Sequence, residues 1–182
     1  MAKIINTPLT DETAKSLRAG DRVLLNGIIY TGRDTAHKRL IEMLDKGEDL
    51  PMDIKDQTIY YVGPCPAKPG QAIGSAGPTT SGRMDAYTPQ LMDAGLRGMI
   101  GKGLRSKAVV DSIIKHNGVY FAAIGGAGAL LAEAIKEAEV IAFPDLGAEA
   151  IYKLRVENFP VTVIIDSEGN DLYKSGKEQY KK

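Results

Sequence analysis

Three segments of this 182-residue chain place a cationic side chain beside glycine backbone. They are Gly32-Arg33-Asp34, the stretch 77–83 (GPTTSGR) and Gly101-Lys102-Gly103. Such loops are typical of anion-binding sites, because backbone amides and a side-chain cation can converge on one negative group. Arginine makes paired hydrogen bonds to a carboxylate or a phosphate, whereas lysine offers a mobile point charge. The three loops therefore predict a site for a small anion, with a dicarboxylate and a phosphate both open.

Several polar side chains in or beside these loops could take part in chemistry. Arg33 precedes an expected helix, so an anion bound there would also meet the free amides of the helix N-terminus. The Thr79 hydroxyl is a poor base unless neighbouring charge, such as Arg83 or Lys102, lowers its proton affinity. Backbone hydrogen bonding within the loop is its alternative role. His37, one turn into the helix, would stay neutral and could shuttle protons, although a surface or capping role is commoner.

Two familiar phosphate-binding signatures fail when their spacing is counted. A Walker loop ending at Gly101-Lys102 needs glycine at position 96 and Ser or Thr at 103, where the chain has Leu96 and Gly103. A dinucleotide-binding fingerprint that includes Gly126-Ala127-Gly128 needs glycine at position 131, where the chain has Leu131. These glycines instead indicate a tight turn from a strand into a helix.

Composition and charge exclude several classes of protein. The chain has 23 Lys plus Arg against 23 Asp plus Glu and a pI near 6.7, so it offers no cationic footprint for nucleic acid or for an anionic membrane surface. Its most apolar stretch, 119–132, is shorter than the ~20 residues that a membrane span needs. Residues 1–12 turn polar and acidic before an apolar signal core could form, so a cytoplasmic location is expected.

The single cysteine, Cys65, excludes an internal disulfide and any zinc or iron–sulfur site held by cysteines of this chain alone. It lies between two prolines without a second thiol or a histidine nearby, and is therefore not a candidate nucleophile. His116 precedes Asn117-Gly118 at an expected helix end, where an imidazole can meet the last carbonyls, and is expected to be structural. We therefore expect this chain to bind no metal by itself.

Hydrophobic periodicity and turn residues indicate alternating strands and helices. Strands are expected at 21–30, 58–62, 99–100, 119–124, 140–143 and 161–165, the first interrupted at Asn26-Gly27 by a hairpin or a bulge. Helices are expected at 34–46 with Asp34 as cap, at 88–94 with Thr88 as cap, after Ser106 as far as Asn117, and at 129–138. A turn is expected at 167–170, and a frayed, solvated tail at 174–182.

This order of elements predicts an α/β fold, with residues 1–182 forming one domain. The glycine-rich loops fall at strand ends, which is where sheets of this class usually bind ligands. The elements therefore place the three cationic loops where an anion site is expected.

The motifs in combination resemble one family. They are Gly32-Arg33-Asp34 with Ala36-His37, YYVGPCPAKPG at 60–70, GPTTSGRM at 77–84, and Gly101-Lys102-Gly103. In this order they are similar to the class I fumarase β subunit, found in iron–sulfur fumarate hydratases and related tartrate dehydratases either as a separate subunit or as the carboxy-terminal domain of a longer chain. The resemblance covers nearly the whole sequence and implies a swivelling β/β/α domain.

The resemblance also implies a reaction and a partner. In that family a 4Fe-4S cluster is held by three cysteines of the α subunit, and its open iron acts as Lewis acid for the departing hydroxide. Matched residue by residue, Arg33 and Arg83 correspond to the carboxylate-binding arginines, Lys102 to the lysine of the GKG loop, and Thr79 to the threonine assigned as base. His37 is a further catalytic candidate. The chain is thus expected to be a hydro-lyase active only with its α subunit, and self-association is also plausible.

Fumarate and malate are preferred over tartrate as substrates because GPCPAKPG and SGRM look closer to the fumarase form. Two other functions stay open. One is a stand-alone module that binds phosphate or a nucleotide. The mismatches to the Walker and dinucleotide-binding spacings argue against this function. The other is a noncatalytic scaffold subunit whose cationic loops serve only an interface. Replacement of Arg83 would separate the scaffold from the enzyme, because it would abolish either assembly or activity.

Overall fold

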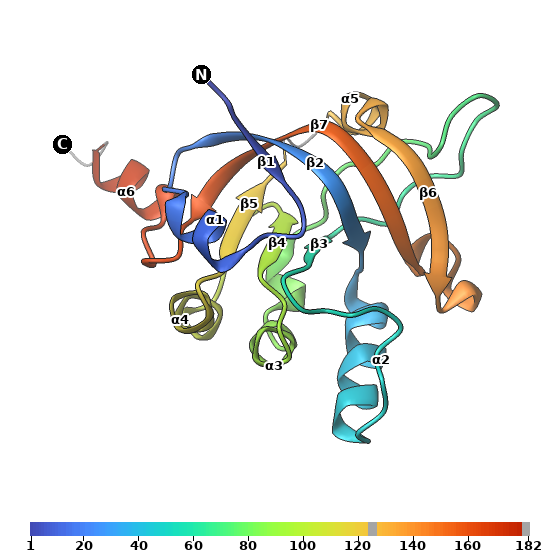
Figure 1. Cartoon of the computed structure of the whole chain (residues 1–182), viewed down its shortest axis with the longest axis horizontal. Coiled ribbons are helices and arrows are strands. Elements are labelled where there is room, and N and C mark those ends of the chain that lie inside the picture. Colours follow the sequence, from blue (N-terminus) through green and yellow to red (C-terminus); the bar gives the residue numbers. More distant parts are fainter. Residues whose placement is uncertain (124–126, 180–182) are drawn as a thin grey trace.

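The computed structural model describes residues 1–123 and 127–179. The strands are β1 (Lys3–Asn6), β2 (Arg22–Thr31), β3 (Thr58–Tyr60), β4 (Gly98–Gly101), β5 (Val119–Ala122), β6 (Ile135–Ala142) and β7 (Ile151–Ile165). The helices are α1 (Asp11–Ser16), α2 (Asp34–Asp45), α3 (Thr88–Asp93), α4 (Lys107–His116), α5 (Gly128–Glu133) and α6 (Leu172–Gln179), with 3-10 helices η1 (Ser81–Met84) and η2 (Pro144–Glu149). Helices and strands alternate along much of the chain (Figure 1), which confirms the α/β class.

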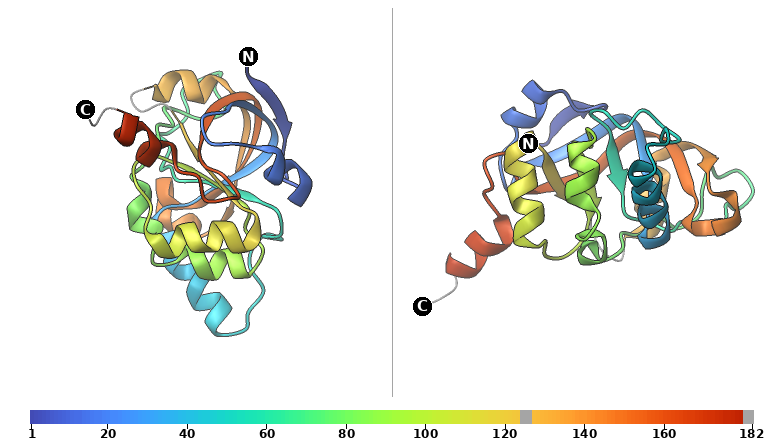
Figure 2. Two further views of the ribbon diagram at one scale, coloured as in Figure 1. Left: turned by 90° about the vertical axis from the view of Figure 1, so that its left-hand side faces the viewer. Right: turned by 90° about the horizontal axis from the view of Figure 1, so that it is seen from below.

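Five strands form a closed barrel of mixed direction. β2, β3, β4 and β5 are parallel neighbours in that order. β7 runs antiparallel to both β5 and β2 and closes the ring. β1 pairs with β2, and β6 pairs with β7, as additional strands outside the ring. Helices α2, α3 and α4 lie side by side on one side of this barrel (Figures 1 and 2).

Residues of the parallel strands alternate between two buried layers. Ile100 and Phe121 belong to the core enclosed by the barrel strands. Their chain neighbours Met99 and Tyr120 belong to a second core, to which the helices contribute Ala36, Leu40, Leu91, Met92, Val109 and Ile113. Because both faces of these strands are buried, the strands are hydrophobic runs without polar alternation.

Strand β2 confirms the expected strand at 21–30 and decides between its two forms. It is one bulged strand, because its pairing with β7 shifts register between Leu25 and Gly27. No hairpin forms at Asn26-Gly27. The bulge lets the long strand bend so that it can pair with β7 along the barrel wall.

Strand β7 is much longer than the strand expected at 161–165. Two residues within it, Asn158 with a φ of 51° and Pro160, are of types that usually interrupt strands. The strand continues through both because it lies between partners: it pairs with β2 over most of its length, with β6 at its start and with β5 at its end. Tertiary pairing therefore overrides the local signals.

The helix expected at 129–138 is wrong in its second half. α5 ends at Glu133, and β6 begins at Ile135, which pairs with Val156 of β7. The alanine-rich composition favours a helix, but the edge of β7 offers hydrogen bonds to an extended chain. The glycine-rich turn expected before this helix includes residues 125 and 126, which lie outside the described residues.

Helix ends match the sequence patterns in part. The helix expected between Ser106 and Asn117 is confirmed, with the Ser106 side chain as cap and Asn117 in the left-handed conformation. Asp34 is not a cap, because Arg33 holds that position and Asp34 is the first residue of α2. Thr88 is likewise the first residue of α3 and not its cap.

The two ends of the chain add elements that the patterns did not indicate. β1 and α1 were not expected, and Leu9 and Leu17, which flank α1, are fully buried in the barrel core. The turn at 167–170 is confirmed. α6 extends into the segment expected to be a tail, where the side chains of Lys174, Ser175, Lys177 and Glu178 are exposed. No helix in the described part of the chain is long and apolar enough to cross a membrane.

Replacement of Phe159 by alanine should lower the free energy of unfolding by about 3–5 kcal/mol. Phe159 is fully buried in β7 opposite Leu25 of β2, and its ring meets that of Tyr60 edge-on at 5.2 Å. Chemical denaturation measures the loss. Val140→Ala, at a position 42% exposed on β6, is the control and should cost less than about 1 kcal/mol. Equal losses in the two variants would contradict the assignment of Phe159 to the barrel core.

Candidate anion-binding site

The carboxyl ends of β2, β3 and β4 lie at one level of the barrel. Thr31 of β2 is the register partner of Tyr60 of β3, and Tyr60 is the partner of Ile100 of β4. Because the strands are parallel, the chain leaves all three at the same rim. Two of the cationic loops directly follow β2 and β4, and the 77–83 loop returns to the end of β3 through the bond of Thr79 N to Tyr61 O, so the structure brings all three to one place.

Backbone hydrogen bonds connect the loops to the strand ends and to one another. These are Gly32 N to Tyr60 O at 3.0 Å, Thr79 N to Tyr61 O at 2.8 Å, and Ser81 N to Lys102 O at 2.9 Å. Thr80 and Lys102 also form an isolated parallel bridge. The GPTTSGR loop therefore lies along the end of β4, beside the segment that carries Lys102.

Arg33 lies at the N-cap of α2 with its guanidinium packed against Gly63. A Cβ on Gly63 would lie 3.0 Å from Arg33 Nη1, so the absence of a side chain gives the guanidinium its room. Arg33 Nε lies 3.5 Å from Glu149 Oε1, an ion pair without hydrogen-bond geometry. The Arg33 side chain is 28% exposed, so an anion from solvent can reach it.

Arg83 lies in η1 and is more accessible to solvent than Arg33. Its side chain is 60% exposed, and its Nη1 is 4.0 Å from Asp34 Oδ2 in the first turn of α2. A pair this long and this exposed contributes little to stability. Most of the hydrogen-bonding capacity of Arg83 therefore stays available for an anion. The attraction of Asp34 keeps the Arg83 guanidinium near α2.

Lys102 and Thr79 lie on the two loops that the backbone bonds join. Lys102 is exposed and Thr79 is half-buried. Close approach of the loops requires Gly101, because a Cβ there would overlap Ser81 Oγ and lie 2.8 Å from a ring carbon of Tyr61. The structure thus places the ammonium-bearing residue and the hydroxyl-bearing residue on adjacent segments of one rim.

His37 is fully buried in the first turns of α2, between the rings of Tyr61 and Tyr87. Its Nδ1 lies 2.8 Å from the carbonyl oxygen of Arg33, so Nδ1 carries the proton and donates it. Burial lowers the pKa of the His37 imidazole to about 4. His37 is therefore neutral at pH 7 and holds the peptide of Arg33 in place.

Three buried polar atoms in the first turn of α2 have no hydrogen-bond partner among the described residues: Arg33 Nε, Asp34 Oδ1 and His37 Nε2. An unpaired buried polar atom costs about 1–3 kcal/mol. Such atoms cluster where a protein is built to meet a polar ligand or ordered water. Asp34 also lies 4.0 Å from Arg83 Nη1, so the rim between α2 and η1 is the candidate place for an anion.

Two residues that contact the site were not found from the sequence. Glu149, which pairs with Arg33, comes from η2 far along the chain, and no local motif marks it. Arg105 follows the GKG loop and is fully buried, with its Nε 2.7 Å from Asp85 Oδ1. A further cation so close in sequence to the GKG loop is a signal that could have drawn attention to Arg105.

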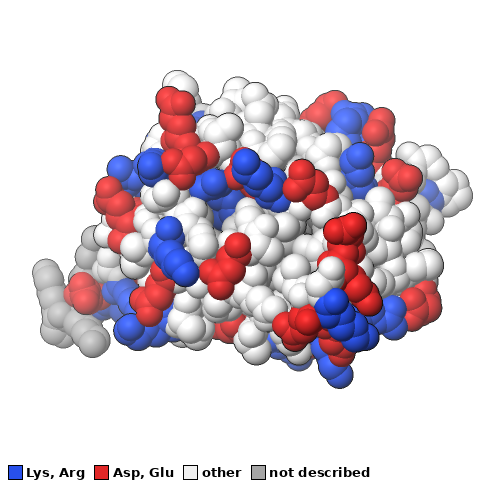
Figure 3. All heavy atoms as spheres, turned by 60° about the horizontal axis from the view of Figure 1, so that its bottom comes forward, with Lys and Arg blue, Asp and Glu red and all other residues white. Residues whose placement is uncertain are grey.

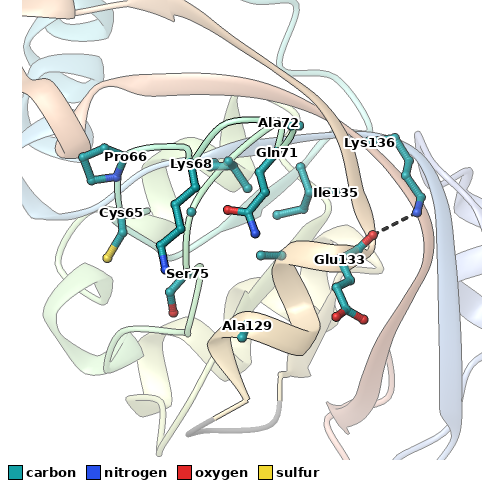
Figure 4. Close-up of a pocket in the computed structure, with 14 residues that line it drawn as sticks. Cys65, Pro66, Lys68, Gln71, Ala72, Ser75, Ala129, Glu133, Ile135 and Lys136 are labelled. Atoms are coloured by element: carbon teal, nitrogen blue, oxygen red, sulfur yellow. Dashed lines mark hydrogen bonds between the residues drawn. The ribbon is translucent and has the colours of Figure 1, made fainter.

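One hollow of the molecule is separate from this site. A cavity of 730 Å³ opens between the loop 65–75 and α5, as Figure 4 shows. Its polar lining includes Lys68, Gln71 and Ser75, and Lys136 donates to the backbone oxygen of Glu133 at its edge. None of the cationic residues of the rim lines it.

Charges of both signs are interspersed over the face that carries α2, α3 and α4 (Figure 3). A broad positive field is absent from that face, so local contacts must recognise an anion. Among residues 1–123 and 127–179, no three His, Cys, Asp or Glu side chains are grouped so that they could hold a metal ion. The fold and this rim define a mixed α/β barrel domain with cationic loops at one edge.

Comparison with known proteins identifies the family. The family model for the fumarase C-terminus matches residues 2–176. The aerobic class I fumarate hydratase of Salmonella typhimurium is 45% identical over 174 residues, which cover 93% of this chain and 30% of that enzyme. Fumarate hydratase 2 of Leishmania major is 47% identical over 156 residues, which cover 85% of this chain and 28% of that enzyme. The chain thus spans about 30% of the length of these relatives.

A relative of similar length has a different name. The putative L(+)-tartrate dehydratase subunit beta of Methanocaldococcus jannaschii is 40% identical over 181 residues, covering 96% of this chain and 93% of that protein. The chain belongs to the fumarase C-terminal domain family, and is homologous both to the C-terminal region of class I fumarate hydratases and to the tartrate dehydratase β subunit.

The burial of His37 predicts a pH dependence of stability. The unfolded chain, with an ordinary histidine pKa of 6.5, takes up a proton before the folded chain does, so stability should fall as the pH drops from about 6.5 to about 4. The loss from this group is about 2 kcal/mol by pH 4.5 and about 3 kcal/mol below pH 4. Denaturation at pH 7 and at about pH 4.5 measures this loss of stability. His37→Gln is the control variant, because it lacks the titrating imidazole. An identical loss in both proteins would mean that the imidazole is not buried in its neutral form.

Proposed function

We propose that this chain is the β-type subunit of an iron–sulfur hydro-lyase that interconverts fumarate and (S)-malate. One observation carries the proposal: the loops of two arginines and a lysine meet at one strand rim, where three buried polar atoms at the start of α2 have no hydrogen-bond partner among the described residues. A dicarboxylate has two anionic groups, and the two guanidiniums can each bind one. Family membership supports the reaction class. We further infer that the chain is a single domain of the swivelling β/β/α type.

Arg33 and Arg83 bind the substrate carboxylates in this proposal. Loss of a proton from the carbon next to a carboxylate moves negative charge onto that carboxylate, as in an enolate. Cations fixed at this position stabilise the transition state more than the ground state. Arg33 is held by Gly63 and by the bond of its carbonyl to His37, so it needs little reorganisation when the charge develops.

Thr79 removes that proton in the dehydration direction and returns it in the hydration direction. Its hydroxyl can act as a base only where positive charge favours the alkoxide, and Lys102 on the bridged segment supplies that charge. His37 is neutral and buried, and we assign it to the positioning of Arg33. Its Nε2 could accept a proton only through a group that reaches the interior of the first turn of α2.

The cluster must be bound by another polypeptide or another part of the enzyme. One cysteine, exposed Cys65, cannot supply three thiolates, and the described residues offer no alternative ligand set. When bound, a 4Fe-4S cluster with an open iron supplies a Lewis acid for the hydroxyl group of malate. The proposed partner is therefore a cluster-bearing α subunit that covers the rim.

L-tartrate dehydration is the second candidate function. It is favoured by the match in length, because the tartrate dehydratase β subunit is aligned over 93% of its own chain. Tartrate and malate are both hydroxy-dicarboxylates, so the same arginines would serve either substrate. The two differ by one hydroxyl, and recognition of that hydroxyl requires a partner atom that the three cationic loops alone do not specify.

Material pulled down anaerobically through the tagged chain from its own cells should hydrate fumarate to malate, whereas the purified chain alone should not. The reason is that this chain supplies cations and base but no cluster ligands. Fumarate consumption and tartrate dehydration are measured side by side by absorbance. Activity with tartrate only would select the second candidate, and activity with neither would leave a non-enzymatic module that binds small anions.

Replacement of Arg83 by methionine should lower kcat/KM by at least about 100-fold while the pulled-down assembly stays intact, because one carboxylate loses its guanidinium. Arg18→Met is the matched control, since Arg18 is also partly exposed but pairs with Glu168 away from the rim. Co-purification is measured by size-exclusion chromatography. Loss of assembly in Arg83→Met, with Arg18→Met unaffected, would favour a scaffold role for the cationic loops.

A further inference from the structure

Arg105 is the most completely enclosed cation in the described part of the chain. Its side chain has 0% exposure, and its guanidinium lies 4.8 Å from the ring centre of Tyr120 and 5.2 Å from that of Tyr61. Its Nε donates to Asp85 Oδ1 at 2.7 Å, and its Nη2 donates to Thr88 Oγ1 at 3.0 Å. It lies between β4 and α4, two residues beyond the GKG loop.

These contacts hold the C-terminal end of η1, the turn that carries Arg83. Asp85, directly after η1, accepts from Arg105 and also from the backbone of Ser106 at 2.6 Å. Thr88 Oγ1 accepts a hydrogen bond from Arg105 and donates one to the carbonyl oxygen of Met84 at 2.8 Å. The two residues that follow Arg83 in the chain are therefore held by one guanidinium, directly or through one hydroxyl.

The ring of Tyr120 extends the network to the other loop. Ser81, at the start of η1, donates to Tyr120 Oη at 2.8 Å, and Tyr120 Oη donates to the carbonyl oxygen of Gly103 at 2.8 Å. Gly103 follows Lys102 directly. A guanidinium stacked on this ring thus lies behind both loops, and its displacement would move Arg83 and Lys102 together.

Stability alone does not account for a charged group at this position. Arg105 Nη1 is buried without a hydrogen-bond partner among the described residues. A buried ion pair is often replaced by well-packed apolar side chains without loss of stability. What an apolar side chain could not supply is a set of directed hydrogen bonds that fixes two loops relative to one another.

From these contacts we propose that Arg105 is a positioning residue that sets the separation of Arg83 and Lys102, and with it the fit of the site to a dicarboxylate. The inference rests on the proposed function for its substrate class. The geometry of the loops does not depend on that function, so it can be tested separately. A misplacement of about 1 Å can reduce the rate of an enzyme about 100-fold.

The test compares Arg105→Lys, Asp85→Asn and Arg97→Lys in the pulled-down assembly. Arg97 is the matched control: its side chain is 14% exposed and bonded to Asp56 and to the end of α4, away from the cationic loops. For Arg105→Lys we expect KM for malate to rise at least about tenfold and kcat/KM to fall about 100-fold. Asp85→Asn should change KM in the same direction, and Arg97→Lys should leave it unchanged.

A purely structural role of Arg105 would reduce the amount of active assembly and so lower kcat, but would leave KM unchanged. An unchanged KM in both Arg105→Lys and Asp85→Asn would overturn the inference. If Arg105→Lys does not fold, Asp85→Asn decides by the same criterion.

Hydrogen exchange of the full chain separates this inference from the proposed function. In Arg105→Lys the amides of residues 79–85 and 101–104 should exchange at least about tenfold faster than in the wild type, while Arg97→Lys should not change them. If the wild-type assembly has no hydro-lyase activity, the proposed function fails and exchange alone tests the positioning role. Equal exchange in these segments for Arg105→Lys and the wild type would overturn it.

Discussion

The antiparallel pairing of β7 with β2 is the contact on which the rest of the structure depends. It extends from Arg22 opposite Thr162 to Tyr30 opposite Lys153, and β7 then continues along β5. A sheet of four parallel strands is thereby closed into a barrel, which fixes the tilt and stagger of its strands. Closure buries the inner side of the barrel strands, while α2, α3 and α4 cover the outer side of the parallel strands, where Ile59, Met99 and Tyr120 are buried. The carboxyl ends of β2, β3 and β4 then lie at one rim, and the loops that reach these strand ends lie together there.

At this rim the basic side chains divide by burial into two kinds. Arg33, Arg83 and Lys102 retain exposure, so an anion can reach them from solvent. His37 and Arg105 are buried and hold peptide groups of the loops: His37 as a neutral donor, and Arg105 as a cation compensated by Asp85 and two aromatic rings. Buried polar groups with directed bonds fix geometry, whereas exposed cations remain free to exchange water for ligand.

Much of the fold could be predicted where the signal is local. The capped helix between Ser106 and Asn117 and the irregularity at Asn26-Gly27 depend on residues close in the chain; the helix is confirmed, and of the hairpin or bulge expected at Gly27 the structure has the bulge. The wrong predictions concern segments whose structure depends on a strand partner far away in the sequence. The segment from Ile135 has a helical composition but pairs with the edge of β7, and β7 runs through Asn158 and Pro160 because strands on both sides supply its hydrogen bonds. Propensity cannot report a partner that lies elsewhere in the sequence.

The sequence by itself determined the alternation of helices and strands, the cationic glycine loops and the resemblance to the fumarase family, because each depends on residues that are close together in the chain. Only the tertiary structure decided that the loops share one rim, that Glu149 pairs with Arg33, and that Arg105 lies buried behind Arg83 and Lys102. These depend on barrel closure, which brings distant segments within hydrogen-bond distance. Burial, which makes His37 neutral, is likewise a property of the folded chain and not of the histidine.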